Sequence, residues 1–273
     1  MKKYFTLALS ALALVFTLAA CSTPQAVQPL KVGMDLRYPP FETQDENGKA
    51  FGISVDVAQA FGKFLGRPVE VVDTNFASLI PALNSGEIDV IIASMSMTAE
   101  RAEAIDFSEP YFYFKIISLV NQKFATANQI TQDSPKTALS DLKSTRFTGI
   151  TGQVSASIPQ SMGFTVEVAT NLEAAVLNVV QGSSEVLMMS AFPVTRGHLA
   201  NPQDTLVLWD PFVSSPIAMG IRKGNTELLT KANEFVKSMP VKGGLYEVLG
   251  TKWNDEVKKL LGRYGLEFFI NKD

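Results

Sequence analysis

The order of hydrophobic and polar positions along the chain predicts strands and helices in alternation. Residues 31–35, 69–73 and 88–93 form short apolar runs, which are typical of buried strands. Residues 54–65 and 76–84 lie between these runs and carry apolar side chains at helical spacing. Strands and helices that alternate in this way favour parallel, buried sheets covered by crossover helices. The chain is therefore expected to be an α/β protein.

A second part of the chain repeats the first at a constant offset of 96 residues. In the first copy Gly86 follows an amphipathic helix, and a buried strand then leads to Ser94. Gly182 and Ser190 hold the same places in the second copy. Any two αβ units resemble one another to this degree, but a length of 273 residues also suggests about two lobes. Open α/β sheets bind ligands beyond the carboxyl ends of their strands, so we expect a ligand cleft between the lobes.

Residues 1–20 form a targeting segment that does not belong to the fold. Two lysines are followed by an apolar stretch, and Leu18-Ala19-Ala20-Cys21 resembles the lipobox of bacterial lipoprotein signals. The resemblance implies cleavage of the signal peptide before Cys21 and lipidation of that cysteine by acyl chains such as palmitate. The alternative is a plain secretory signal with a chance cysteine, although Cys21 is the only cysteine in the sequence.

The residues after the signal indicate how the body of the protein is held. Residues 21–29 are polar and contain proline, which is typical of a flexible tether. No later segment of the sequence approaches the run of about 18 apolar residues that a membrane-spanning helix needs. We therefore expect an extracytoplasmic body that acyl chains anchor to a bacterial cell membrane, on the periplasmic side or at the cell surface.

Composition and charge exclude several other classes of protein. The chain is 46% hydrophobic and 19% charged, as in ordinary globular proteins. The formal charge is −3, or −5 without residues 1–20, and its signs are interspersed, so no basic stripe predicts a nucleic acid partner. A single cysteine and a single histidine exclude an internal disulfide and any metal motif that needs a histidine pair. We expect no metal, no cofactor and no nucleic acid.

Several motifs together resemble one family of bacterial proteins. Residues 32–41 read VGMDLRYPPF, residues 86–91 read GEIDVI, and residues 94–101 read SMSMTAER. Residues 106–111, DFSEPY, and residues 220–225, GIRKGN, continue the match over nearly the whole chain after the tether. The chain resembles the amino-acid-type, family 3, extracellular solute-binding proteins of bacterial ABC importers.

This resemblance implies a two-lobed periplasmic-binding-protein-like type II fold with a hinge and an interlobe ligand cleft. The larger lobe would comprise residues 30–115 and the return segment 214–273, and the smaller lobe would comprise residues 116–213. A small carboxylate-bearing solute, an amino acid or a related compound, would close the two lobes. The membrane subunits of the importer would then recognise the closed, monomeric binding protein.

The resemblance also assigns roles to residues of the larger lobe. Arg101 matches the arginine that clamps the ligand's carboxylate, a task suited to the planar guanidinium fork. Ser94 and Ser96 would complete the carboxylate site. Tyr38 would pack on the ligand's side chain, and Asp35 would face its distal end. The alternatives are a surface arginine paired with a nearby glutamate, a tyrosine in ordinary core packing and an aspartate that caps a turn.

Three further residues complete the predicted ligand-binding set, namely Met95 from the larger lobe and Gln153 and Ser190 from the smaller one. The smaller lobe departs from the family's pattern of glycine, serine or threonine, and threonine. Here the matching residues are Gly152-Gln153-Val154, so the threonine hydroxyl that helps to hold the carboxylate is absent, although Ser155 follows directly.

Two other departures concern the walls and the charge of the site. The family's aromatic residue before the first helix corresponds to Ile53, so a second aromatic wall is missing unless Phe51 replaces it. Ser190 stands where the family commonly has an acidic residue that pairs with the ligand's α-ammonium. A neutral hydroxyl cannot balance a desolvated ammonium. The ligand is therefore either a carboxylate without an amine, or an amine that reaches Asp35 or another acidic residue.

Two alternative functions share the same fold. The family includes cyclohexadienyl dehydratases, enzymes that use the cleft to eliminate water and carbon dioxide and need a general acid there. A ligand-presenting receptor for a membrane sensor would use the same closed state as a transport protein. No G-x-S-x-G or G-x-x-x-x-G-K-[ST] motif for hydrolytic or nucleotide chemistry is present in the sequence. The sequence therefore predicts a binding protein of an ABC importer and no catalytic residues.

Overall fold

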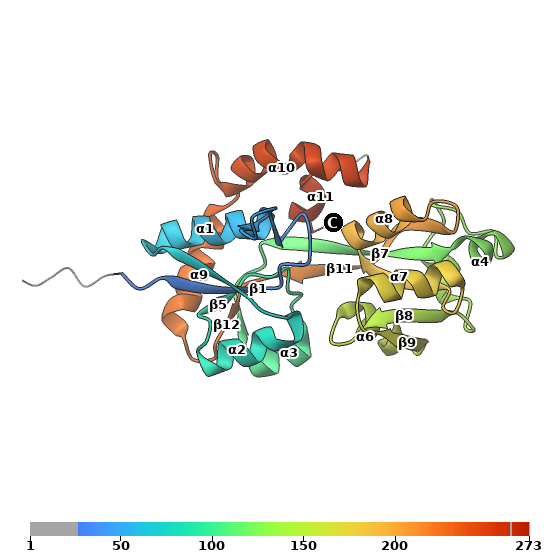
Figure 1. The fold of residues 1–273 in the computed structure, drawn as a ribbon, viewed down its shortest axis with the longest axis horizontal. Coiled ribbons are helices and arrows are strands. Elements are labelled where there is room, and N and C mark those ends of the chain that lie inside the picture. The colour runs from blue at the N-terminus through green and yellow to red at the C-terminus, as the bar shows by residue number, and fades with distance from the viewer. Residues whose placement is uncertain (1–26, 263, 273) are drawn as a thin grey trace, which may run out of the picture.

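In the computed structural model, which describes residues 27–262 and 264–272, the chain forms two lobes that are joined by two long strands (Figure 1). Each lobe is built on a five-stranded sheet with helices packed against it. The predicted α/β class is confirmed. The predicted signal peptide and Cys21 lie outside the described residues. Within the described part of the chain, no helix is long and apolar enough to cross a membrane.

The sheet of the larger lobe has the strand order β4-β1-β5-β12-β6. Strands β4, β1 and β5 run parallel, and β12 pairs antiparallel with both β5 and β6. The strands are β1 (Leu30–Met34), β4 (Val69–Asp73), β5 (Val90–Ile91), β6 (Asp106–Phe107) and β12 (Gly220–Ile221), with a separate hairpin of β2 (Thr43–Gln44) and β3 (Ala50–Phe51).

The helices of the larger lobe come from both ends of the described chain. The C-terminal helix α10 packs against α1 and also reaches α8 of the smaller lobe, and its Leu249 and Trp253 are buried as their helical spacing predicts. The helices are α1 (Ile53–Leu65), a short 3-10 helix (Phe76–Ser78), α2 (Leu79–Ser85), α3 (Ala99–Ala104), α9 (Thr226–Ser238), α10 (Leu245–Leu261) and α11 (Glu267–Ile270).

The sheet of the smaller lobe has the order β11-β7-β10-β8-β9, in which β9, β8 and β10 are parallel. Its strands are β7 (Phe112–Asn121), β8 (Arg146–Ile150), β9 (Thr165–Ala169), β10 (Val186–Ser190) and β11 (Thr205–Ile217). Its helices are α4 (Gln122–Ala127), α5 (Thr137–Ser140), α6 (Val154–Ser161), α7 (Leu172–Gln181) and α8 (Ala191–Ala200).

Strands β7 and β11 pair antiparallel along their length and run from one lobe to the other (Figure 1). Their register shifts between Leu208 and Val213, so the pair is irregular near the middle. The predicted lobe boundaries after residues 115 and 213 fall inside β7 and β11 and stay predictions. Beside them the buried Lys115 donates a 2.9 Å hydrogen bond from Nζ to the carbonyl of Asn271, which holds the C-terminal segment against the crossing strands.

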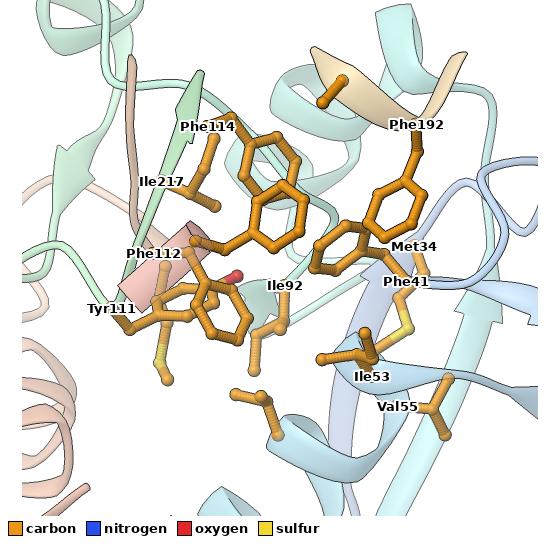
Figure 2. Close-up of a cluster of buried hydrophobic side chains, with 14 of the residues drawn as sticks. Met34, Phe41, Ile53, Val55, Ile92, Tyr111, Phe112, Phe114, Phe192 and Ile217 are labelled. Atoms are coloured by element: carbon orange, nitrogen blue, oxygen red, sulfur yellow. The ribbon is translucent and has the colours of Figure 1, made fainter. Parts of the chain in front are cut away.

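Phe41 lies at the centre of an aromatic cluster where the lobes meet. Its ring centroid is 4.6 Å from that of Phe114 and 5.9 Å from that of Phe112, both on β7. It is 5.5 Å from Phe192 on α8 and 5.4 Å from Phe269 on α11. Figure 2 shows the rings of Phe41, Phe114 and Phe192 close together in this cluster. Such tilted and edge-to-face contacts add to the free energy gained by burying the rings.

Most of the predicted elements are confirmed, and the differences have simple causes. The strands predicted at 31–35 and 69–73 are β1 and β4, each within one residue. The helix predicted at 76–84 begins with a 3-10 turn, because Pro81 has no N–H with which to continue an α-helical ladder backwards. The strand predicted at 88–93 is limited to Val90–Ile91, since the ladder to β1 ends there.

We expect Phe41→Ala to lower the free energy of unfolding by about 3–5 kcal/mol, because it leaves a cavity between rings from several elements. Phe64→Ala is the matched control. Phe64 packs against a single ring, that of Phe235, and is 43% exposed. Its loss should be about 1 kcal/mol or less. Urea unfolding followed by circular dichroism measures both values. Equal losses in the two variants would show that the cluster does not dominate the junction.

Candidate ligand-binding cavity

A cavity of about 440 Å³ lies between the two lobes. The carboxyl ends of β5 and β10 open onto it, so the prediction drawn from the 96-residue repeat is confirmed in its location. The wall combines aromatic and aliphatic side chains with many polar and charged ones. Binding sites for small molecules use such polar groups to orient the ligand. The larger lobe contributes side chains from several loops and helices and from the start of β7 to the wall. Among them are Asp35, Arg37, Tyr38, Glu42, Asn75, Phe76, Ser94, Ser96, Arg101 and Phe114.

The structure brings seven of the eight predicted ligand-binding residues to the cavity wall. These are Asp35, Tyr38, Ser94, Ser96, Arg101, Gln153 and Ser190. The eighth, Met95, is only 1% exposed and packs in the core of the larger lobe with Leu79 and Ile91. Its predicted place at the cavity is wrong, because its apolar side chain packs among the core residues of the larger lobe. Ser94 and Ser96 face the cavity, and Met95 between them faces the core.

Arg101 is held in place by contacts that reach both lobes. It lies in the first turn of α3, where the hydroxyl of Thr98 accepts the Arg101 backbone N–H at 3.2 Å. Its guanidinium donates to the carbonyl of Ser96 at 2.8 Å and to the carbonyl of Gly152, in the smaller lobe, at 2.9 Å. The ring of Phe76 lies under it at 5.0 Å. Burial lowers the pKa of Arg101, but a guanidinium stays charged at neutral pH.

Asp35 is already engaged by other groups of the larger lobe. Its carboxylate accepts the Nε–H of Arg37 at 2.6 Å and the backbone N–H of Phe76 at 2.9 Å. Arg37 also donates to the side-chain oxygen of Asn75 at 3.0 Å. This geometry matches the alternative in which Asp35 caps a turn at the end of its strand. The Asp35 carboxylate reaches the cavity with its charge balanced by Arg37, so it is not a free acidic group.

Tyr38 forms part of the aromatic wall and a contact between the lobes. Its ring lies 6.0 Å from that of Phe41 and 6.4 Å from that of Phe114, in near-parallel arrangement. Its hydroxyl shares a hydrogen bond with Ser190 Oγ at the end of β10. Burial raises the pKa of the Tyr38 hydroxyl further above its usual value, so it stays neutral and able to donate. Tyr38 and Ser190 therefore meet across the cavity.

The second aromatic wall comes from residues that the sequence did not single out. Ile53 is fully buried in the core, and Phe51 is 43% exposed and packs on Trp253 with 5.0 Å between centroids, so neither supplies it. Phe76 and Phe114 line the cavity instead. Phe76 is the first residue of the predicted helix, and Phe114 reads as one apolar residue of a buried strand, so periodicity could not assign either to a site.

The smaller lobe contributes Gln153 to the cavity but not the hydroxyl of the nearby Ser155. Gln153 is half-buried at the start of α6 and lines the cavity. Ser155 is fully buried, and its Oγ accepts the backbone N–H of Ile150 at 3.0 Å. Ser155 therefore fastens α6 to the end of β8 and does not replace the missing threonine hydroxyl.

Glu42 is a buried carboxyl group at the cavity that the sequence did not single out. It is 1% exposed, yet it lines the cavity and accepts a 2.9 Å hydrogen bond from Ser94 Oγ. Its backbone exchanges hydrogen bonds with Tyr38, from Tyr38 N–H to Glu42 at 2.8 Å and from Glu42 N–H to Tyr38 at 3.0 Å. Burial raises the pKa of Glu42 to about 8, against the opposing effect of the Ser94 hydrogen bond. In the ligand-free protein this carboxyl is mostly protonated at neutral pH.

Ser94 has a backbone conformation that few residues adopt. Its φ is 51°, in the left-handed region that residues other than glycine, asparagine and aspartate rarely adopt. The same residue donates to Glu42 and sits at the end of β5. Strained residues of this kind are concentrated at binding sites, where neighbouring contacts hold them in place.

Comparison with known proteins places the chain among transport proteins. The model of the family described as bacterial extracellular solute-binding proteins, family 3, matches residues 30–256. The chain is 25% identical over 242 residues to the L-arginine-binding protein of Pseudomonas aeruginosa. The match covers 85% of this chain and 90% of that relative.

Two solved structures extend the similarity to the whole fold. An ancestral arginine-binding protein bound to arginine is 31% identical, has a TM-score of 0.67, and matches 82% of this chain and 97% of its own. An ancestral amino acid-binding protein described as a precursor of cyclohexadienyl dehydratase is 27% identical, with a TM-score of 0.66, and matches 82% of this chain and 94% of its own. The predicted two-lobed fold is confirmed by these neighbours.

We expect Glu42→Gln to change the pH dependence of stability in the ligand-free protein. The folded-state pKa of about 8 lies above the unfolded value of about 4.3, so the folded state binds the extra proton and loses stability as the pH rises towards 8. Glutamine has no such proton, so the variant lacks this loss of stability. Between the two pKa values, the free energy of unfolding of the unmodified protein should fall relative to that of the variant by about 1.4 kcal/mol for each unit that the pH rises.

Urea unfolding of both proteins at pH 5.5 and pH 7.5 measures this difference. The comparison cancels the titration of every group that the two proteins share. A difference that is the same at both pH values would contradict the elevated pKa of Glu42.

Proposed function

The chain belongs to the bacterial extracellular solute-binding proteins, family 3, and on this basis we propose that it delivers an amino acid or a related small carboxylate to an ABC importer. Its named relatives are amino-acid-binding proteins, which supports a substrate-binding role. The bound solute would lie in the cavity between the lobes. Closure of the lobes around it would create the surface that the importer's membrane subunits recognise.

The observation that carries this proposal is the position of Arg101. Its guanidinium is partly buried, lies on the ring of Phe76 and already donates to carbonyl oxygens of both lobes. A ligand carboxylate that accepts from Arg101 would therefore be held at the place where the lobes meet. Because this contact exists only with the lobes together, binding there favours the closed form.

The other lining residues would divide the remaining tasks. The backbone of Ser94 and the hydroxyl of Ser96 would serve the carboxylate, since the Ser94 hydroxyl already donates to Glu42. Gln153 would contribute from the smaller lobe, next to the Gly152 carbonyl that Arg101 contacts. The rings of Tyr38 and Phe114 provide an apolar wall for the ligand's side chain. A site of this kind uses a few polar groups for orientation and apolar walls for most of the contact.

We expect Arg101→Ala to weaken binding by at least about 100-fold, because it removes two charge-assisted hydrogen bonds to the carboxylate. Isothermal titration calorimetry with the amino acid that gives the largest thermal shift in a panel of amino acids and small carboxylates measures the loss. Arg67→Ala is the matched control. Arg67 also binds a carboxylate and two carbonyls, those of Asp89, Gln28 and Pro29, but it does not line the interlobe cavity.

Affinity in the Arg67→Ala variant should equal that of the unmodified protein. If Arg101→Ala binds as tightly as the control, the carboxylate is held elsewhere. If no amino acid or carboxylate in the panel stabilises the unmodified protein, the proposed function is wrong.

A second candidate function is dehydration of a cyclic carboxylic acid. Glu42 supports it, because a buried carboxyl that is protonated at neutral pH can act as the general acid that such chemistry needs. One structural neighbour is named as a precursor of such an enzyme. We nevertheless propose binding without turnover, since the named relatives are binding proteins. Incubation with prephenate and arogenate, followed by chromatography, tests for product.

We also propose that the mature protein is a lipid-anchored monomer. The support is the sequence Leu18-Ala19-Ala20-Cys21 at the end of the signal segment and the polar residues that follow. Two acyl chains, rather than one, give stable attachment to a membrane.

Cys21→Ser should therefore release the protein into the soluble fraction and abolish incorporation of radiolabelled palmitate. Fractionation and immunoblotting of cells that express each form measure the release. Ser22→Ala, one residue further on, is the control and should stay with the membrane. A Cys21→Ser protein that still incorporates radiolabelled palmitate would contradict the anchor.

A further inference from the structure

An amino acid carries an ammonium as well as a carboxylate, and the cavity must balance both charges. In the proposed function, Arg101 binds the carboxylate. Three carboxyl groups line the same cavity: Asp35, Glu42 and Glu173. Asp35 is paired with Arg37, and Glu173 is exposed at the start of α7. Glu42 is the buried one of the three, and no ion pair among residues 27–262 and 264–272 includes it.

Polar groups from both lobes gather next to Glu42. Ser94 Oγ donates to its carboxyl, and Tyr38 is its partner in a backbone bridge. The Tyr38 hydroxyl meets Ser190 Oγ from the smaller lobe. An ammonium has three N–H donors and no acceptor, so it needs several oxygen acceptors in one place. Glu42, Tyr38 and Ser190 all line the cavity and offer such acceptors, and Tyr38 contacts both of the others.

We propose that Glu42 is the specificity-determining residue that binds the ligand's α-ammonium, with the hydroxyls of Tyr38 and Ser190 beside it. This inference rests on the proposed function. It makes the ligand class an α-amino acid rather than a carboxylate that lacks the amine. Glu42 and Arg101 then hold the two charges that all α-amino acids share.

Binding through Glu42 has a consequence for protons. With no cation beside it, Glu42 holds a proton at neutral pH, because burial raises its pKa to about 8. An ammonium next to the carboxylate stabilises the ionised form, so the proton leaves Glu42 for solvent as the amino acid binds. The titratable groups that face Glu42 do not take it up. Tyr38 and Tyr111 have pKa values raised by burial, and Asp35 is paired with Arg37.

The direction of the pH dependence follows from this release. Below pH 8, binding must first remove a proton, so affinity for an amino acid rises with pH. A folded-state pKa of about 8 gives a gain of about 50-fold between pH 6 and pH 8. A ligand without an amine needs no ionised Glu42, and its affinity should not rise over this range.

Calorimetric titration with paired probes tests the inference. The pairs are L-arginine with 5-guanidinopentanoate, L-glutamine with 4-carbamoylbutanoate, and L-leucine with 4-methylpentanoate. In each pair the two molecules differ only in the α-ammonium. The proteins are the unmodified chain, Glu42→Gln and, as the matched control, Glu167→Gln. Glu167 also accepts a 2.9 Å hydrogen bond from a serine hydroxyl, that of Ser184, but it does not line the cavity.

We expect Glu42→Gln to weaken binding of the preferred amino acid by about 30-fold or more, as when one partner of a buried charge pair is removed. Binding of its deaminated partner should change less than about threefold. Glu167→Gln should bind both as the unmodified protein does. The pH series on the unmodified protein, from pH 6 to pH 8, gives a second readout that needs no variant to fold.

Several outcomes would overturn the inference and leave the proposed function intact. One is an unmodified protein that prefers the deaminated acids. Another is a Glu42→Gln variant that loses neither probe, or loses both equally. A third is an affinity for the amino acid that does not change between pH 6 and pH 8. If the unmodified protein binds no probe of either kind, the proposed function fails, and the inference fails with it.

Discussion

The arrangement of the whole molecule depends on the packing of Phe41 where β7 and β11 pass between the lobes. Rings from β7, α8 and α11 enclose it, so parts of the chain that are distant in sequence are fixed against one another. Tyr38 and Glu42 flank Phe41 in the same tight turn and are paired through their backbones. With Phe41 buried in the junction, the turn presents Tyr38 and Glu42 to the cavity. One buried ring therefore sets both the joint between the lobes and one wall of the site.

The cavity separates charges that would neutralise each other if they met. Arg101 lies on Phe76 and is bonded to main-chain oxygens, while Asp35 is paired with Arg37. Glu42 is enclosed near Tyr38 and has no cationic partner among the described residues. The rings of Phe76 and Phe114 also line the cavity. Apolar surface next to a charged group lowers the effective dielectric constant and strengthens its electrostatic interaction with a bound molecule. The site is therefore suited to small solutes that carry a charged group in a defined position.

The periodicity of the sequence predicts the strands and helices, and the repeat suggests two lobes. The resemblance to the family, rather than periodicity, predicts Arg101 and the other six predicted residues that line the cavity. The apolar side chain of Met95, between two serines, would also have favoured a place in the core over one at the cavity. Glu42 and Phe114 could not be predicted in this way. The burial of Glu42 depends on elements far from it in sequence, and a carboxylate after an apolar run is usually the start of a solvated segment. Three-dimensional enclosure alone turns it into an unusual acid.

The position of β12 determines the order in which the chain can complete its fold. β12 lies between β5 and β6 and pairs with both, although these two strands precede the entire smaller lobe in sequence and β12 follows it. During synthesis β5 and β6 must wait without their shared neighbour while strands β7 to β11 emerge, and the smaller lobe has local pairings of its own to form meanwhile. The lobe that begins to emerge first is the last to be finished.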